Sequence, residues 1–251
     1  MRLDTLVRFL DEYLLIAAET ADSPEALNGL QVSNAGDVTR LAAAVDLCQA
    51  TVRLAAEQHA DCLLVHHGLF WGGLRPLVGP AYARVAGLIK NNIALYAAHL
   101  PLDRHPDVGN NRVLAKLLGL KVRGDFGDYH GAPAGVWGDW SGTREELSWA
   151  LSRTLGTAAR LFPFGPERVQ RVGIVTGSGG SLIPQAAAAG LDTFITGEGQ
   201  HWTFFDAEEL GLNVFYAGHY ATETVGVKAL AEHVSKKFDI PWVFLDHPTG
   251  L

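Results

Sequence analysis

Residues 61–71, with the sequence DCLLVHHGLFW, decide the fold. A short apolar run, residues 62–65, stops at His66, His67 and Gly68. An apolar run of this length between polar neighbours predicts an interior strand of a parallel sheet. Functional groups in open α/β sheets gather just beyond the carboxyl ends of such strands, which is where the two histidines stand. Their position alone also suits an ordinary loop, so a metal role depends on ligands from other segments.

The segments around this stretch alternate between apolar runs and helical patterns. This alternation predicts βαβ units and a mostly parallel sheet. Strands are expected over residues 41–46, 62–67, 93–98, 134–140, 171–176, 192–196, 213–217 and 242–245. Helices are expected over residues 3–19, 49–59, 80–91, 111–118, 144–155, 181–189, 201–210 and 222–237.

The alternation breaks at residues 121–133, which are rich in charged residues and glycine. We place a domain boundary there, so that residues 1–124 form one α/β domain and residues 125–221 a second, similar one. Residues 222–251 are assigned to the first domain, to which the last helix and strand would return. The expected fold is therefore two similar α/β domains with mostly parallel sheets. The metal site is expected between them, at the carboxyl ends of strands.

Composition narrows the class of protein. The net charge of −7 argues against a broad surface for nucleic acid. No stretch approaches the roughly 20 apolar residues that cross a bilayer, and no targeting signal is expected at the start. Cys48 and Cys62 lack C-x-x-C spacing, which argues against a disulfide framework or a cysteine-zinc site and favours a reducing cytoplasm. A metal here would use histidine and carboxylate ligands.

Half of the histidines stand at, or just past, expected strand ends. These five are His66, His67, His99, His201 and His219. Scattered surface histidines have no reason to gather at such positions, which makes this coincidence the strongest signal for a site. Glu223 follows His219 by four residues at the start of an expected helix, so both can face one point. Helix capping is the alternative reading for His219.

The adjacent histidines point to two ions. Neighbouring side chains should diverge if the strand pleat persists, which suits two separate metals better than one. With Asp103 and a bridging Glu223, ions about 3.5–4 Å apart are geometrically reasonable. Imidazole and carboxylate suit zinc, iron, manganese, nickel or cobalt and do not distinguish among them.

Two weaker signals concern substrate and protons. The turn over residues 176–181 lies between an expected strand and helix, and its N–H groups would hold a phosphate or simply form a tight turn. The phosphate reading uses Gly177, Gly179 and Gly180. Two of the three candidate proton carriers, Glu198 and His201, have alternative roles: each would orient a metal ligand or cap a helix. The three carriers are His99, Glu198 and His201.

Six motifs occur in one order along nearly the whole chain. They are NGLQV (28–32), VHHGLFW (65–71), HLPLD (99–103), GNN (109–111), ITGE (195–198) and AGHYATE (217–223). In this order the chain resembles the Nif-three-like family (Ngg-one-interacting-factor-like proteins), whose bacterial members are named type 2 homologues of GTP cyclohydrolase I.

The resemblance implies a dinuclear metal site. Position by position, it implies that His67 and Asp103 bind one ion, that His66 and His219 bind the other, and that Glu223 bridges them. It also implies two α/β domains and a toroidal hexamer whose metal sites face an internal cavity.

Three functions are compatible with these ligands. The first is a metal-dependent hydrolase that uses a metal-activated water on GTP or a related nucleotide or heterocycle, opening the purine imidazole ring and releasing formate. The second is a metal-binding chaperone or insertion protein without catalysis, and the third is an interaction scaffold with structural metals. The resemblance favours the first.

Overall fold

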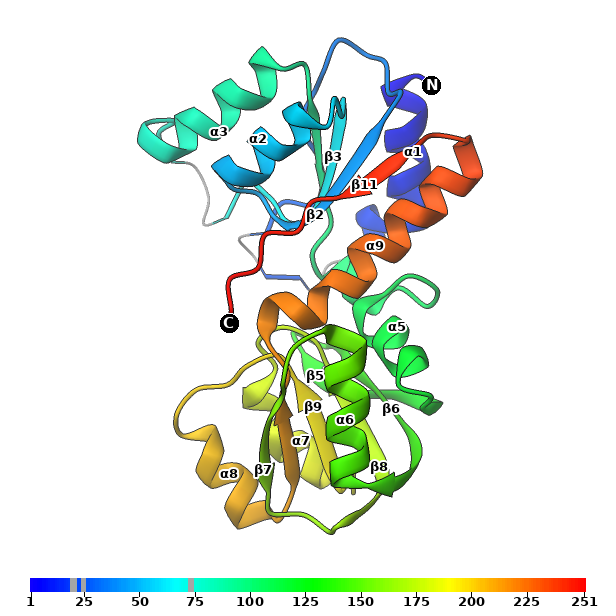
Figure 1. The fold of residues 1–251 in the computed structure, drawn as a ribbon, viewed down its shortest axis with the longest axis vertical. Coiled ribbons are helices and arrows are strands. Elements are labelled where there is room, and N and C mark those ends of the chain that lie inside the picture. Colours follow the sequence, from blue (N-terminus) through cyan, green and yellow to red (C-terminus); the bar gives the residue numbers. More distant parts are fainter. Residues whose placement is uncertain (19–21, 24–25, 72–74) are drawn as a thin grey trace. The chain divides into compact units, whose positions relative to one another are not determined.

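The chain divides into two compact units (Figure 1). The computed structural model describes residues 1–18, 22–23, 26–71 and 75–251. The first unit contains residues 1–108 and 226–247, and the second contains residues 109–225 and 248–251. The change to the second unit thus comes earlier than the boundary expected at residue 124, and the return to the first comes at residue 226.

The first unit is a sheet with helices on both faces. Its strands are β1 (Gly29–Val32), β2 (Leu41–Asp46), β3 (Cys62–His67), β4 (Ala94–Ala97) and β11 (Trp242–Phe244). Its helices are α1 (Leu3–Tyr13), α2 (Gln49–Glu57), α3 (Gly79–Lys90), α4 (Leu100–Arg104) and the 3₁₀ turn η1 (Ile16–Ala18). Helix α9 (His219–Phe238) begins in the second unit and continues in the first.

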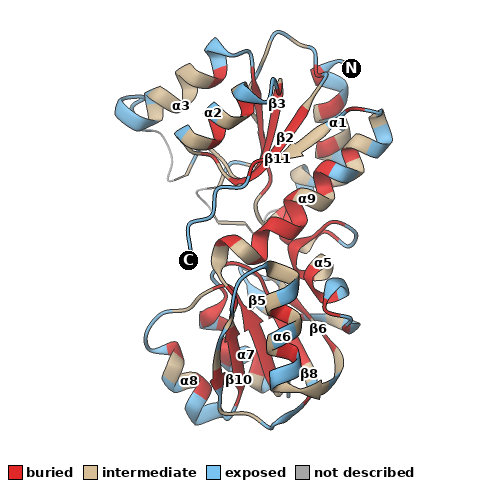
Figure 2. Cartoon of the chain, in the orientation of Figure 1, coloured by how far each residue is buried: buried red, intermediate tan, exposed pale blue. Residues whose placement is uncertain are grey.

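The first sheet is mostly parallel, as the alternating pattern predicts. Its strand order is β1-β4-β3-β2-β11, and β1 alone runs antiparallel to its neighbour. Strands β2, β3 and β4 are buried almost throughout (Figure 2), because helices α2 and α3 cover one face and α1 and α9 the other. Residues Val52, Ala55 and Leu88 of the covering helices pack against Leu63 and Val65.

Helix α1 is shorter than the pattern predicts. Leu3, Leu6 and Leu10 recur at helical spacing and are buried, which explains why the segment is helical. The helix ends at Tyr13 because Leu15 takes a positive φ of 54°. The expected end at residue 19 lies outside the described residues.

The second unit is also a sheet with helices on both faces. Its strands are β5 (Lys121–Tyr129), β6 (Ala132–Thr143), β7 (Arg160–Pro163), β8 (Arg168–Val175), β9 (Thr193–Thr196) and β10 (Asn213–Tyr216). Its helices are α5 (Asn110–Leu117), α6 (Arg144–Leu155), α7 (Ile183–Ala188), α8 (Thr203–Leu210) and the 3₁₀ turn η2 (Gly180–Leu182). Helices α5 and α6 share one hydrophobic core with the sheet, and α7 and α8 share another.

The prediction of a mostly parallel sheet is wrong for this unit. The strand order is β5-β6-β8-β9-β10-β7, and only the pairs β8–β9 and β9–β10 are parallel. Residues 121–133, expected as a break, form the hairpin β5–β6. Its loop is His130 and Gly131, both at positive φ (56° and 86°), and a two-residue loop of this kind forces antiparallel pairing. Charged side chains line β5 because it is an edge strand.

Helix α6 has the bounds that the sequence predicts. Thr143 accepts a hydrogen bond from the Glu146 N–H at 3.2 Å, and the Thr143 N–H donates to Glu146 Oε2 at 2.7 Å. This capping box begins the helix, and Gly156, at φ 72°, ends it.

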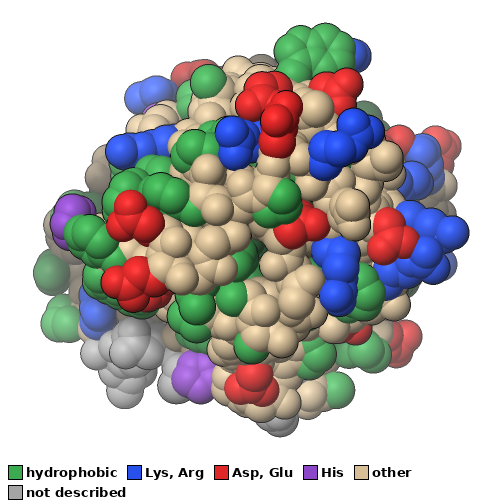
Figure 3. Space-filling model, turned by 90° about the horizontal axis from the view of Figure 1, so that it is seen from below, with side chains coloured by type: hydrophobic (Ala, Val, Ile, Leu, Met, Phe, Trp, Pro, Cys, Tyr) green, Lys and Arg blue, Asp and Glu red, His purple; other side chains and the backbone are tan. Residues whose placement is uncertain are grey.

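The charges of the surface are mixed. On the face drawn in Figure 3, acidic and basic side chains alternate with hydrophobic ones. Within the described residues, no helix combines the length and the apolar character that a membrane crossing requires.

Candidate functional site

Three histidines meet at the carboxyl ends of β3 and β4 in the first unit. His66 and His67 are the last two residues of β3, and His99 follows β4. Each offers one ring nitrogen, and these nitrogens lie within 4.8 Å of one another. The strand-end argument therefore brings His66, His67 and His99 together. From sequence, His99 was expected only as a proton carrier. In the structure its ring nitrogen also lies in the group with His66 and His67 that could hold a metal ion.

The imidazole of His66 is fully buried and held in one orientation. Its Nδ1 lies 2.9 Å from the carbonyl oxygen of Ala98. A carbonyl oxygen only accepts, so Nδ1 carries a proton, and in the neutral ring the lone pair is then on Nε2. Nε2 lies 3.5 Å from Oδ2 of Asp103, which α4 carries in a buried position. The Nε2 lone pair and the Asp103 carboxylate can both donate to one cation, and such a cation makes their close approach favourable.

The imidazole of His67 is held from the other neighbouring strand. Its Nδ1 lies 2.8 Å from Oδ1 of Asp46, the last residue of β2. The His66 and His67 rings nevertheless stay adjacent, with centroids 4.6 Å apart, so the expectation that they diverge is wrong. Pairing of β3 with β4 ends at Val65, whereas pairing with β2 continues to His67.

His99 has a carboxylate partner as well. Its Nδ1 lies 2.7 Å from Oδ1 of Asp22, and Asn28 Nδ2 donates to the other oxygen at 2.7 Å. Burial alone would raise the pKa of Asp22, but the hydrogen bond and charge of His99, aided by Asn28, lower the pKa below its usual value. Trp71 meets the His99 ring edge-on at 4.9 Å and the His67 ring at 5.7 Å. Trp71 therefore forms a wall beside both imidazoles.

The second unit presents one histidine between two glutamates. His219 opens α9, and its Nε2 lies 3.2 Å from Oε1 of Glu223, one helical turn on. Its Nδ1 lies 2.8 Å from Oε1 of Glu198. Burial would lower the pKa of His219, but the two glutamates outweigh it and raise the pKa to about 9. Glu198 thus orients His219, one of the two roles left open for it.

The glycine turn does not offer its N–H groups to a ligand. Gly177 N–H donates to Thr222 Oγ1 at 3.0 Å, and Gly179 N–H donates to Thr196 Oγ1 at 2.9 Å. Gly180 N–H donates to the Glu198 carbonyl oxygen at 3.1 Å. Each of these three donors is thus already used inside the protein, and the phosphate role of the glycines stays a prediction.

Gly177 instead leaves room for the carboxylate of Glu223. It has a φ of +67°, and a Cβ there would collide with the Glu223 carboxylate. His201 stands apart from His219: it is exposed and meets the Phe205 ring edge-on at 5.7 Å. The structure gives no support to His201 as a proton carrier.

Sequence reasoning included Glu198 among the groups that orient a histidine but missed the other oxygens with this role. Asp46 ends an expected strand next to β3, so its position was a usable signal. Asp22 lies 77 residues from His99 in sequence, and no local pattern marks it. Asn28 was read as part of a tight turn, yet its side chain also accepts from the His99 N–H at 2.7 Å.

Comparisons with known proteins agree with the motifs. The family model described as Duf34/NIF3 (NGG1p interacting factor 3) matches residues 1–249. A protein of Deinococcus radiodurans named GTP cyclohydrolase 1 type 2 homolog is 46% identical over 250 residues, covering 99% of this chain and 94% of the relative. One of the same name from Archaeoglobus fulgidus is 42% identical over 253 residues, with both chains fully covered at 100%.

Solved structures share the whole fold. The crystal structure of TTHA1606 from Thermus thermophilus matches with a TM-score of 0.92 and 45% identity, covering 100% of both chains. Reduced HcgD from Methanocaldococcus jannaschii matches with a TM-score of 0.85 and 27% identity, covering 98% of both. The chain therefore belongs to the Duf34/NIF3 (NGG1p interacting factor 3) family.

Proposed function

We propose that this protein is a metal-dependent hydrolase with two divalent ions. One observation carries the proposal: His66, His67 and His219 each have Nδ1 held by an oxygen, from Ala98, Asp46 and Glu198 respectively. Histidines that bind metal typically donate the other ring N–H to a carboxylate or carbonyl in this way, which fixes the ring and directs Nε2 to the ion.

The donor atoms fit such ions. We propose that five residues supply the ligands. They are His66, His67 and Asp103 of the first unit and His219 and Glu223 of the second. Nitrogen and carboxylate donors suit zinc, iron, manganese, nickel or cobalt. The resemblance pairs Asp103 with His67, whereas Asp103 Oδ2 lies 3.5 Å from His66 Nε2.

Two divalent ions held by these residues would lower the pKa of a bound water and so supply a nucleophile near neutral pH. The residues of the chain then orient the ligands and move protons. The proposed proton carrier is His99 at Nε2, because the Asp22 carboxylate at Nδ1 stabilises the imidazolium that results. His66 is shielded from water by its burial, which strengthens its interaction with a cation.

The proposed substrate is GTP or a related nucleotide or heterocycle. The names of the Deinococcus and Archaeoglobus relatives support this class. The reaction we propose is hydrolytic opening of the purine imidazole ring with release of formate. We further propose a toroidal hexamer, supported by the family resemblance and testable by analytical ultracentrifugation.

Metal analysis followed by a substrate screen tests the proposal. Purified protein is analysed for bound metal, loaded with the identified ion, and assayed with GTP and a panel of nucleotides for formate release. We expect the wild type to bind two ions per chain and to turn over a nucleotide. We expect Glu223→Gln to abolish this turnover.

A matched control is Glu208→Gln, which changes an exposed glutamate of the same unit and should leave metal content and turnover unchanged. Two bound ions with no turnover on any nucleotide would refute the hydrolase. Rapid exchange of those ions with a chelator would then favour the metal-handling protein.

A further inference from the structure

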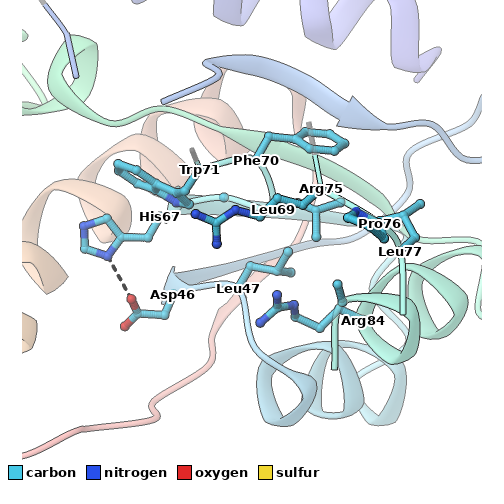
Figure 4. Close-up of a pocket in the computed structure, with 12 residues that line it drawn as sticks. Asp46, Leu47, His67, Leu69, Phe70, Trp71, Arg75, Pro76, Leu77 and Arg84 are labelled. Atoms are coloured by element: carbon cyan, nitrogen blue, oxygen red, sulfur yellow. Dashed lines mark hydrogen bonds and ion pairs between the residues drawn. The ribbon is translucent and has the colours of Figure 1, made fainter. Parts of the chain in front are cut away.

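A pocket of about 350 Å³ opens beside His67 in the first unit (Figure 4). This volume lies in the range of about 300–1,000 Å³ that is usual for small-molecule sites. Asp46 and His67 lie at one end of it, and Trp71, Arg75 and Arg84 are also among its lining residues. A molecule in this pocket would therefore reach an imidazole that we propose as a metal ligand.

Two arginines give the pocket its charge. Arg75 and Arg84 extend into it toward the end where His67 lies (Figure 4). Nε of Arg84 is buried and has no hydrogen-bond acceptor within the described residues. A buried donor without an acceptor is destabilising, so the position favours an oxyanion as acceptor.

The acidic side chain in the lining does not meet this need. Oδ1 of Asp46 is held by His67 Nδ1 at 2.8 Å, at the far end of the pocket from the apolar residues Pro76 and Leu77. Two guanidinium groups against one engaged carboxylate leave the pocket net positive. Guanidinium groups bind phosphate and carboxylate through paired hydrogen bonds, which a single ammonium cannot do.

Apolar side chains supply the remaining wall. Leu47, Leu69, Phe70 and Trp71 line it together with the arginines. The Trp71 indole is fixed by its edge-on contacts with His67 and His99. A flat ring of a ligand is therefore offered a preformed aromatic surface next to the cationic groups.

We infer that this pocket binds a small molecule with a planar ring and a phosphate or carboxylate group. Arg75 and Arg84 hold the anion, and Trp71 contacts the ring. The inference rests on the proposed function only in taking this molecule to be the substrate of the metal centre. It assigns a binding role to two arginines that no motif of the chain singled out.

Binding to the metal-free protein tests the pocket without any turnover. Calorimetry is performed with phenyl phosphate and with benzoate, which share a ring and differ in the anion. We expect one of the two to bind, and its identity names the anion. Arg84→Gln and Arg75→Gln should each weaken that binding about ten-fold or more, since charged hydrogen bonds contribute about 1.5–3 kcal/mol.

Matched variants separate the pocket from general effects. Arg53→Gln removes an exposed arginine of α2 in the same unit and should bind like the wild type. Arg84→Lys keeps the charge without the paired donors and should fall between the wild type and Arg84→Gln. Trp71→Leu should weaken phenyl phosphate more than inorganic phosphate. Circular dichroism verifies that each variant is folded.

The outcomes distinguish this inference from the hydrolase proposal. Failure of both probes to bind the wild type, or equal binding by wild type and both arginine-to-glutamine variants, overturns the pocket. Unchanged KM for a turned-over nucleotide in those variants also overturns it while leaving the hydrolase intact. Loss of probe binding in the arginine variants, with no turnover by metal-loaded wild type, supports the pocket and removes only the hydrolase.

Discussion

The two units present candidate ligand atoms by different structural means. In the first, His66 and His67 stand at the end of a buried strand, and oxygens from the ends of both neighbouring strands fix their rings. In the second, His219 and Glu223 share one face of a helix start, and a loop carboxylate fixes the histidine. A strand end thus gathers imidazoles from several chain segments, whereas a helix start gives one imidazole and one carboxylate from a single turn.

This difference predicts that the two units contribute unequally to metal affinity. The first unit groups three imidazole nitrogens within 4.8 Å by itself. The second contributes a carboxylate beside a histidine that carries a proton in the metal-free protein, because its pKa is raised to about 9. We therefore expect the first unit to dominate metal affinity.

Removal of a first-unit ligand has the largest expected effect. His66→Ala should reduce metal affinity by more than the roughly 100-fold that outer-shell changes cause, because it removes a proposed ligand itself and not only a group that orients one. Elemental analysis after dialysis measures the loss. His59→Asn, at an exposed helix end, is the control. Equal metal content in His66→Ala and wild type would break the comparison.

Removal of the orienting carboxylates has the next largest effect. Asp46→Ala and Glu198→Ala should each weaken metal binding about 10- to 100-fold, since each leaves one histidine ring without its Nδ1 acceptor. Competition with a chelator of known affinity measures both. Similar losses would show that orientation matters equally in the two units.

Exposed acidic residues serve as controls for this pair. Glu57→Ala in the first unit and Glu208→Ala in the second remove the same charge from exposed positions. If either control weakens metal binding as much as its partner variant, net charge and not ring orientation explains the loss.

The glycine beside Glu223 has a smaller, structural effect. Gly177→Ala should lower the free energy of unfolding by about 1–2 kcal/mol for the left-handed backbone and further for the collision with Glu223. Gly156→Ala, at φ 72° with open space around it, carries the backbone cost alone. Urea unfolding compares them. Equal losses would mean that Glu223 moves aside at no cost.

The smallest expected effect is a pH dependence in the first unit. Burial lowers the pKa of His105, whose Nε2–H donates to the Tyr13 carbonyl oxygen at 2.9 Å. The unfolded chain then binds more protons than the folded one below about pH 6.5, so stability is full above that value and falls as the pH drops. The shift is opposite in direction to that of His219.

Urea unfolding of metal-free protein at pH 7.5 and 5.5 measures this dependence. The wild type should lose more stability between the two than His105→Gln, which lacks the titrating ring. An equal pH slope in both proteins would assign the acid sensitivity to other groups.

Sequence alone predicts the fold best where burial or capping leaves a local pattern. The apolar runs of β2, β3 and β4 and the capping box of Thr143 and Glu146 are of this kind. Strand β5 escaped prediction because an exposed edge strand needs no apolar period. Its hairpin depended on positive φ at His130, which residue type suggests only weakly.

The candidate site also has a part that the sequence predicts and a part that it does not. The positions of the histidines follow from strand ends, so sequence finds them. Their partners do not, because Asp46 and Asp22 reach their histidines across 21 and 77 residues through tertiary contacts. The two arginines of the pocket were missed for the same reason: Arg75 and Arg84 converge only when α3 packs beside the loop after β3.

Helix α9 has a consequence for the order in which the chain folds. The first unit needs residues 226–247, since β11 pairs with β2 and the Leu245 N–H donates to the Ala43 carbonyl oxygen. The second unit is nearly continuous in sequence, from residue 109 to residue 225. During synthesis the second unit can therefore complete its sheet first. The first must wait, with one sheet edge open, until residues 226–247 have left the ribosome.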